Sequence, residues 1–120
     1  MADNTAGQTR AQSADQGTAQ YAAGSVVYDA TTITAADSTR IETGFKPRYV
    51  VWINATDRTR IEWFEGMAAN NCIKTAAAGT VTLETTNGGI TVDDRGFRVL
   101  QNATLAAILA SKTCYWQARG

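Results

Sequence analysis

Two adjacent segments, one continuously apolar and the next alternating, constrain the fold of this chain more than any other feature. Residues 49–53 form an unbroken run of aromatic and β-branched side chains, which favours a central β-strand packed on both faces. Turn residues follow at 54–57, and the next segment alternates between two faces. One face would carry Thr59, Ile61 and Trp63, and the other Arg60, Glu62 and Phe64. The two segments therefore predict an antiparallel hairpin at the centre of a sheet.

Phe64 is the one aromatic residue on the otherwise polar face of this hairpin. An exposed aromatic side chain there would indicate a contact with another subunit or with a partner. A Phe covered by the chain's own N-terminal segment fits the pattern equally well. The sequence leaves both interpretations open.

The charge balance and the lack of histidine narrow the possible functions. The 120-residue chain has 11 basic and 11 acidic residues, so no overall field attracts nucleic acid or an anionic membrane. No apolar run reaches the roughly 20 residues of a membrane span, and the N-terminus lacks a signal-peptide pattern, so we expect synthesis in the cytoplasm. Without histidine, the commonest general base and metal ligand is missing. We therefore expect a protein that is not an enzyme and binds no nucleic acid, membrane or cofactor.

Cys72 and Cys114 are the only two thiols, too few for a disulfide framework. Synthesis in the cytoplasm favours the reduced form. A disulfide that forms later, outside the cell, is the alternative.

Residues 1–20 contain no large apolar side chain after Met1, so they bury too little surface to offset the entropy of ordering. We expect a flexible, extended N-terminal arm over 1–20 and a β-sandwich domain over 21–120. The arm would become ordered only against a protein surface, and a solubilising tail without a partner is the alternative.

Short extended segments separated by turn residues continue to the end of the chain. They lie at 25–29 and 31–34 (or as one bent strand), 37–43, 72–75, 80–85, 90–92, 97–100 and 112–119. Asn-Gly-Gly at 87–89 predicts a tight hairpin turn between the strands on either side of it. The segment 102–110 fits either a helical turn or an apolar strand. This spacing predicts an all-β fold, a single antiparallel β-sandwich or barrel-like domain preceded by the arm.

Three groups of residues could carry chemistry or binding, and each has a simpler explanation. Glu62 and Glu84 lie on separate strands and could form a glycosidase pair, but solvated carboxylates are more common. Asp93 and Asp94 with Glu84 could hold calcium, although turn residues explain them better. A sugar-stacking platform would need exposed aromatic side chains, and core packing is the simpler interpretation of these. The platform residues would be Trp52, Trp63, Tyr115 and Trp116.

Several short segments occur in a telling order: Gly-Phe-Lys-Pro-Arg-Tyr-Val-Val at 44–51, Glu-Trp-Phe-Glu-Gly-Met at 62–67, Lys-Thr at 74–75, Gly-Thr at 79–80, Gly-Phe at 96–97 and Tyr-Trp-Gln-Ala at 115–118. This order, with the Ala/Gln/Thr-rich arm, resembles small virion structural proteins of tailed bacteriophages. The resemblance runs from about residue 44 to the end and gives no catalytic residues to carry over.

The resemblance implies a head decoration or cement protein on the outer surface of the virion, or a fibre-associated protein. Its partners would be the major capsid protein and copies of itself, in a homo-oligomer such as a dimer or trimer. The alternative is a receptor-binding or fibre-tip module that recognises a host-surface glycan through the aromatic residues. Candidate partner contacts are Tyr21, Val26, Tyr28, Phe64 and Met67.

Overall fold

The computed structural model describes residues 8–15, 20–29, 38–85, 89–100 and 111–120, and in these ranges it contains ten β-strands and no helix. The strands are β1 (Gln8–Asp15), β2 (Tyr21–Tyr28), β3 (Ser38–Glu42), β4 (Tyr49–Asn54), β5 (Thr59–Phe64), β6 (Cys72–Thr75), β7 (Val81–Glu84), β8 (Ile90–Asp93), β9 (Gly96–Leu100) and β10 (Thr113–Arg119).

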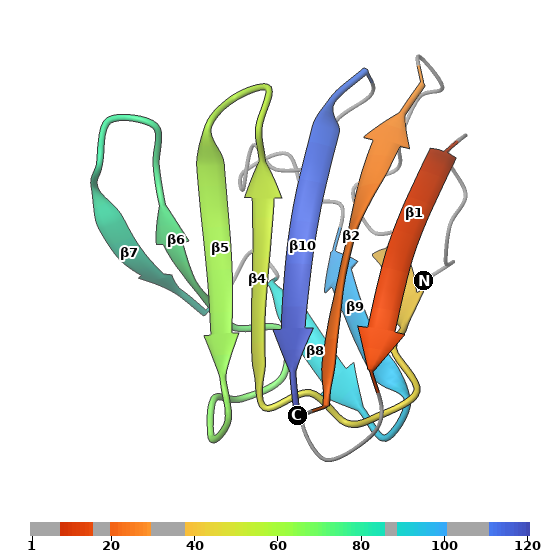
Figure 1. The fold of residues 1–120 in the computed structure, drawn as a ribbon. Helices are drawn as coiled ribbons and strands as arrows, with labels where there is room; N and C mark the ends of the chain where they lie inside the picture. The colour runs from red at the N-terminus through yellow and green to blue at the C-terminus, as the bar shows by residue number, and fades with distance from the viewer. Residues whose placement is uncertain (1–7, 16–19, 30–37, 86–88, 101–110) are drawn as a thin grey trace.

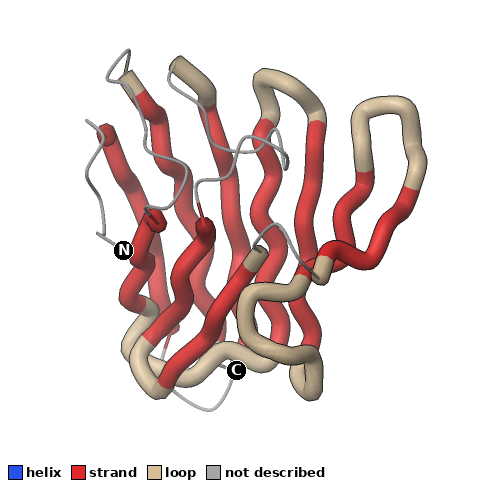
Figure 2. The backbone as a smooth tube through the Cα atoms, turned by 180° about the vertical axis from the view of Figure 1, so that it is seen from behind, coloured by secondary structure: helices blue, strands red, loops and turns tan. Residues whose placement is uncertain are grey.

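The strands form two antiparallel sheets that pack face to face (Figures 1 and 2). The large sheet has seven strands in the order β1-β2-β10-β4-β5-β6-β7, and the small sheet has three in the order β3-β9-β8. The prediction of an all-β antiparallel sandwich is therefore confirmed. The predicted hairpin is also confirmed, because β4 is the middle strand of the large sheet and pairs with β5 from Tyr49↔Phe64 to Asn54↔Thr59.

Aromatic side chains from both sheets meet at the centre of the core. Trp52 of β4 and Trp116 of β10 lie side by side, because they are partners in the ladder. Phe97 of the small sheet packs edge-on against both indoles, with ring centroids 6.3 and 5.5 Å away. Edge-to-face contacts of this kind add to the stabilisation that burial gives. This cluster fixes the small sheet over the middle of the large one.

Gly96 lets the edge strand β3 approach β9 closely. A Cβ built on Gly96 would lie 2.0 Å from the backbone oxygen of Ile41, which no side chain can tolerate. Gly96 pairs with Glu42, the residue after Ile41, at the end of the β3–β9 ladder. The glycine is therefore needed for the pairing of the small sheet.

The hairpin predicted around 87–89 is wrong. β7 pairs with β6 in the large sheet, whereas β8 pairs with β9 in the small sheet, so the chain changes sheets between them. Residues 86–88 lie outside the described residues. Gly89 has a different role from a turn glycine, because a Cβ there would come within 2.7 Å of the backbone of Asn71. The turn-forming residue types lie where the chain crosses from one sheet to the other, and local chemistry alone does not distinguish such a crossover from a hairpin turn.

Part of the segment expected to be a flexible arm forms a strand instead. β1 pairs with β2 over its full length, from Gln8↔Tyr28 to Asp15↔Tyr21. An edge strand gains its hydrogen bonds from the backbone, so it needs no large apolar side chain. The surface that orders this segment belongs to the same chain. The rest of the arm, like the segment 102–110, lies outside the described residues.

Candidate interaction surface

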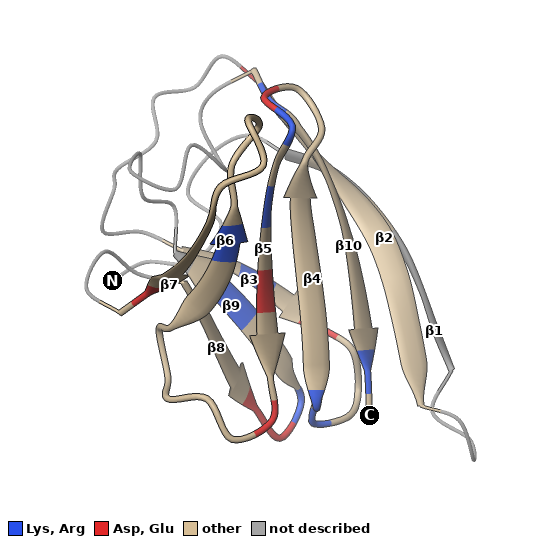
Figure 3. Ribbon diagram, turned by 90° about the vertical axis from the view of Figure 1, so that its left-hand side faces the viewer, with Lys and Arg blue, Asp and Glu red and all other residues tan. Residues whose placement is uncertain are grey.

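One face of the large sheet packs on the small sheet, and no part of the described chain lies over the opposite face (Figures 1 and 3). We call the uncovered side the outer face of the large sheet. The strand pattern explains which side chains lie there, because alternate residues point to opposite sides. In β4, for example, Val50, Trp52 and Asn54 are buried while the residues between them are half-buried. The prediction that the central strand is packed on both faces is thus wrong for the outer face.

All the large hydrophobic residues that are exposed in the described ranges lie on this outer face. They come from four strands of the large sheet and lie near both ends of those strands. They are Tyr21, Val27, Phe64, Val81, Leu83 and Tyr115. Their side follows from the ladder, because each alternates along its strand with residues that face the core, or pairs with a residue that faces outward. Exposed apolar side chains that are confined to one uncovered face favour an interaction site there.

Phe64 lies in an aromatic row near one end of the outer face. Its ring is 5.1 Å from that of Tyr49, and the guanidinium of Arg119 lies 6.0 Å from the Tyr49 ring centre. Phe64 is 42% exposed. β1 lies at the far edge of the large sheet from β5, so the described part of the arm does not cover it. The interpretation of Phe64 as a free contact residue is the one that the geometry supports.

The polar groups of the outer face are bonded to each other. The hydroxyl of Tyr49 donates to Glu62 Oε2 at 2.7 Å, and Arg60 pairs with the same carboxylate at 3.5 Å. Burial, together with the hydrogen bond to Glu62, raises the pKa of Tyr49 to about 12. A hydroxyl held in its neutral form beside a carboxylate adds no charge to the surface. The middle of the face is therefore rigid and close to neutral.

A shallow depression of about 480 Å³ lies at the other end of this face. Its lining residues are Ile53, Ala55, Arg58, Arg60 and Thr75. The turn beside it is held in place by Asn54, whose Oδ1 accepts the backbone N–H groups of Thr56 and Asp57. The Asn54 side chain is buried and stabilises the turn. The depression could receive one apolar side chain of a partner.

The structure divides the five candidate contact residues. Tyr21 and Phe64 lie on the outer face and are exposed. Val26 and Tyr28 are buried in the core, so their assignment as contacts is wrong; the Tyr28 hydroxyl bonds Thr39 Oγ1 at 2.6 Å. In β2 the residues that face solvent are the alternate ones, Tyr21 and Val27. Tyr21 lies on the opposite face of β2 from Val26 and Tyr28, so the three residues do not form one contact surface.

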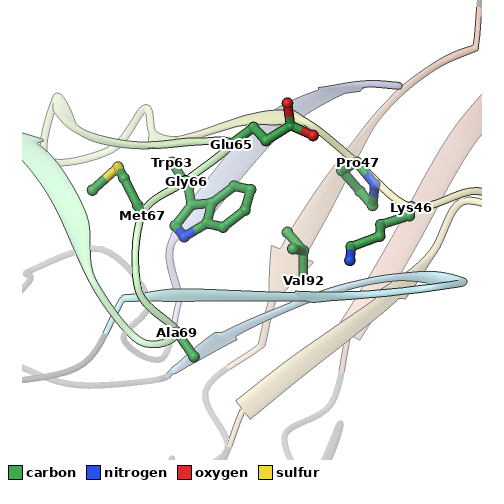
Figure 4. A pocket seen from close by; sticks show the side chains of 8 residues that line it. All are labelled: Lys46, Pro47, Trp63, Glu65, Gly66, Met67, Ala69 and Val92. Carbon is green, nitrogen blue, oxygen red and sulfur yellow. The ribbon is translucent and has the colours of Figure 1, made fainter.

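Met67 is one of the residues that line a separate cavity of about 300 Å³, which lies between the end of β5 and β8 (Figure 4). Trp63 forms one wall, and its indole N–H donates to the backbone oxygen of Ala68 at 3.3 Å. The charged side chains at this cavity are Lys46 and Glu65. Glu65 pairs with Arg48 at 3.5 Å, and no second carboxylate is among the described residues that line the cavity. The geometry does not favour catalysis there.

The carboxylates considered for catalysis or calcium binding are not brought together. Glu62 points to the outer face, whereas Glu84 pairs with the buried Cys72 and so lies on the inner side of its strand. Asp93 is engaged by Arg40 at 3.0 Å and by the backbone N–H of Arg95 at 2.9 Å. Across the described ranges there is no group of three His, Cys, Asp or Glu residues that could hold a metal ion. The glycosidase geometry and the calcium site therefore lack support.

The aromatic platform proposed for sugar binding does not form. Trp52, Trp63 and Trp116 are 0%, 6% and 4% exposed, which leaves Tyr115 alone at the surface. The simpler interpretation, that the tryptophans belong to the core, is confirmed. Tyr115 reaches solvent because it alternates in β10 with the buried Cys114 and Trp116. Alternation with Cys114 and Trp116 was the signal that could have identified Tyr115 as a surface residue. In β7 the same pattern favours an inward position for Val81 and Leu83, and the structure exposes both.

Both cysteines are free and buried, and burial raises the pKa of each thiol to about 12. Cys72 lies in β6 and Cys114 in β10, with β4 and β5 between them. Three strand spacings amount to about 14 Å, which is twice the Cα separation that a disulfide allows. The reduced form that the sequence favoured is the one that this fold permits.

Comparisons with protein-family models, with curated proteins and with solved structures found no match. In the part of the chain that the structure describes, no helix is long and apolar enough to cross a membrane.

Proposed function

We propose that this protein is a non-enzymatic structural protein of a bacteriophage virion, which binds the outer surface of the capsid as a decoration or cement protein. One observation carries the proposal: the exposed large hydrophobic residues of the described chain all lie on a single uncovered sheet face. The likeness of the short segments along the chain to phage virion proteins suggests which partner this face meets.

The size of the face suits a specific contact. The seven strands of the large sheet, at about 4.8 Å spacing and each about six residues long, give a flat area on the order of 700 Å² before side-chain relief is counted. Specific interfaces bury about 800 Å² on each partner, and isolated apolar patches on monomers rarely exceed a few hundred. Burial of exposed apolar area contributes about 25 cal/mol per Å². Most of the binding energy would therefore be hydrophobic.

The charges fit an exposed position on a shell rather than a nucleic-acid contact. On the outer face, Glu62 is paired with Arg60, and Arg119 lies over an aromatic ring. A face with so little net charge gives a contact that depends weakly on salt. Many copies on a repeating shell would each add a modest contact, and the sum would stabilise the particle.

The test is binding of purified protein to phage heads that lack it. We expect Tyr115→Glu to weaken binding by about tenfold or more, because a buried unpaired carboxylate costs several kcal/mol. Ala69→Glu is the matched control: it adds the same charge at an exposed loop position away from the outer face, and it should bind as wild type does. If Tyr115→Glu and Phe64→Glu both bound as tightly as wild type, docking through this face would be refuted.

A second measurement addresses stabilisation itself. Heads with and without the bound protein are compared for survival of heat and of low salt. We expect complete heads to survive at higher temperature. Equal survival would show that the protein does not act as cement, whatever it binds.

A further inference from the structure

β7 is the last strand of the large sheet, and its far edge has no partner in the described ranges. Figure 2 shows the β6–β7 hairpin extending from the side of the sandwich. Val81 and Leu83 are 64% and 62% exposed, more than any other large hydrophobic residue described. Thr82, which points to the opposite side, is also exposed. Solvent therefore reaches both faces and the open edge of this strand.

Soluble proteins usually protect such an edge with a lysine, a proline, a bulge or an inward-pointing charge. The sequence of β7 is Val-Thr-Leu-Glu, with its single charge at the last position. The two edges of the small sheet are different, because Arg40 of β3 and Asp93 of β8 carry charges and are bonded to each other. Apart from its short length and the inward-facing Glu84 at its end, β7 has none of these protective features, and an apolar edge of this kind can pair with another strand.

The hydrogen bonds of the hairpin turn fix which backbone groups are free. The backbone N–H of Ala76 donates to the carbonyl of Thr80 at 2.9 Å, so the backbone N–H and C=O groups of Thr80 point to β6. In an antiparallel ladder the direction of these groups alternates along the strand. The backbone N–H and C=O groups of Thr82 then also point to β6, whereas those of Val81 and Leu83 point to the open edge.

We propose that this edge pairs with the same edge of a second copy of the chain, antiparallel and with a two-fold axis at Thr82. In this register Val81 lies opposite Leu83 of the partner subunit, and the free N–H and C=O groups of both residues are satisfied. Two-fold pairing is self-complementary, which is why a second copy fits this edge without any other sequence being needed. Val81 and Leu83 would then form apolar cross-strand pairs on the outer side.

The pairing would join two large sheets into one and continue the outer face from one copy to the next. The paired edge is only about 13 Å long, so the contact is weak between free molecules and is strengthened where copies are held close together. The inference does not depend on capsid binding, because it uses the edge of the sheet and not its face.

Cross-linking through an introduced cysteine tests the register in the full-length protein. At the two-fold axis, Thr82 lies opposite Thr82 of the partner subunit in the closely spaced, non-hydrogen-bonded type of pair, which suits a disulfide. We expect Thr82→Cys to form a covalent dimer under mild oxidation about tenfold faster than the control Ala77→Cys, an exposed position in the hairpin turn. The two native thiols are buried and should not interfere.

A mixture of Val81→Cys and Leu83→Cys proteins is the second test of the register. These positions face each other across the proposed axis, so the mixture should form more covalent dimer than either variant alone. Equal rates for Thr82→Cys and Ala77→Cys, or no preference in the mixture, would overturn the proposed pairing.

A backbone substitution separates strand pairing from mere apolar contact. Leu83→Pro removes an N–H that points to the open edge and leaves the bonds to β6 in place. We expect it to abolish the cross-linking of Thr82→Cys, whereas Leu83→Ala keeps the N–H and retains cross-linking. Circular dichroism of each variant checks that the fold is intact. Cross-linking that survives Leu83→Pro would show that the copies do not pair through their backbones.

Discussion

The outer faces of the two sheets differ sharply although both belong to the same sandwich. On the small sheet, Asp93 accepts from Arg40 at 3.0 Å and lies 3.9 Å from Arg98 (Figure 3). On the large sheet, the exposed residues include Phe64 and Tyr115, which are 42% and 52% exposed. On the outer face of the small sheet the charged groups pair with each other, whereas the outer face of the large sheet leaves apolar side chains exposed.

This difference separates what the chain needs in order to fold from what it offers to a partner. Ion pairs within a sheet face have no remaining capacity for a partner, whereas exposed apolar side chains gain free energy when a partner covers them. We therefore expect substitutions on the small sheet to change the free energy of unfolding and substitutions on the outer face of the large sheet to change binding.

The largest expected effect is that of Gly96→Ala in the small sheet. The added Cβ would lie 2.0 Å from the Ile41 oxygen, so β3 must move away, and we expect a loss of about 3 kcal/mol or more in the free energy of unfolding. Gly79→Ala is the control: its φ of +94° is unfavourable for alanine but the space is open, which predicts about 1 kcal/mol. Urea unfolding measures both. Similar losses would mean that close approach of β3 does not matter.

Two arginines, one on each sheet, give a matched comparison of the next largest effect. The Arg40 side chain is 13% exposed, whereas that of Arg60 is 49% exposed and lies 3.5 Å from its carboxylate. We expect Arg40→Gln to cost about 1–2 kcal/mol because a half-buried Asp93 loses its partner, and Arg60→Gln to cost below about 0.5 kcal/mol. Equal costs in urea unfolding would contradict the contrast between the two faces.

The sequence predicted the fold well where side-chain alternation and sheet burial agree. The β4–β5 hairpin and the burial of Cys114 and Trp116 on one face of β10 both follow from period-two patterning. The class of the fold followed from many short strands with turns between them. Local pattern is sufficient for such elements, because each is specified by its own residues.

What failed depended on partners distant in the sequence. The Asn-Gly-Gly segment at 87–89 is suited to a hairpin turn, but the choice between β6 and β8 as the partner of β7 is made by the whole sheet. β1 has no apolar signal because its pairing with β2 uses the backbone. Val26 and Tyr28 were assigned to the surface since composition does not say which alternate residues face inward. The candidate surface became visible only when the strands were placed side by side.

Acid should weaken the small sheet through Asp93. Burial alone would raise its pKa, but the backbone N–H of Arg95 and the charge and hydrogen bond of Arg40 outweigh that effect and hold the pKa below its usual 3.8. A lowered pKa means that the folded state prefers the carboxylate, so this stabilisation is present above about pH 4 and is lost as the pH falls through the lowered value.

We therefore expect Asp93→Asn to be less stable than wild type at pH 7, with the difference shrinking as the pH falls below about 4. Asp94→Asn removes a more exposed carboxylate from the same turn and serves as the control. Urea midpoints at several pH values provide the measurement. A stability difference that is constant from pH 7 to the acid range would show that Asp93 does not carry this linkage.

The smallest expected effect on stability, and the most direct test of the comparison, is at the exposed edge of the large sheet. Leu83 is 62% exposed, so Leu83→Thr removes little buried area, and it introduces a β-branched side chain suited to a strand. We expect the free energy of unfolding to change by less than about 0.5 kcal/mol. Val99→Thr, at a fully buried position of the small sheet, should cost about 1–3 kcal/mol because it buries a hydroxyl. If Leu83→Thr were as costly as Val99→Thr, the edge would be part of the folding core, and its apolar residues would need no partner to explain them.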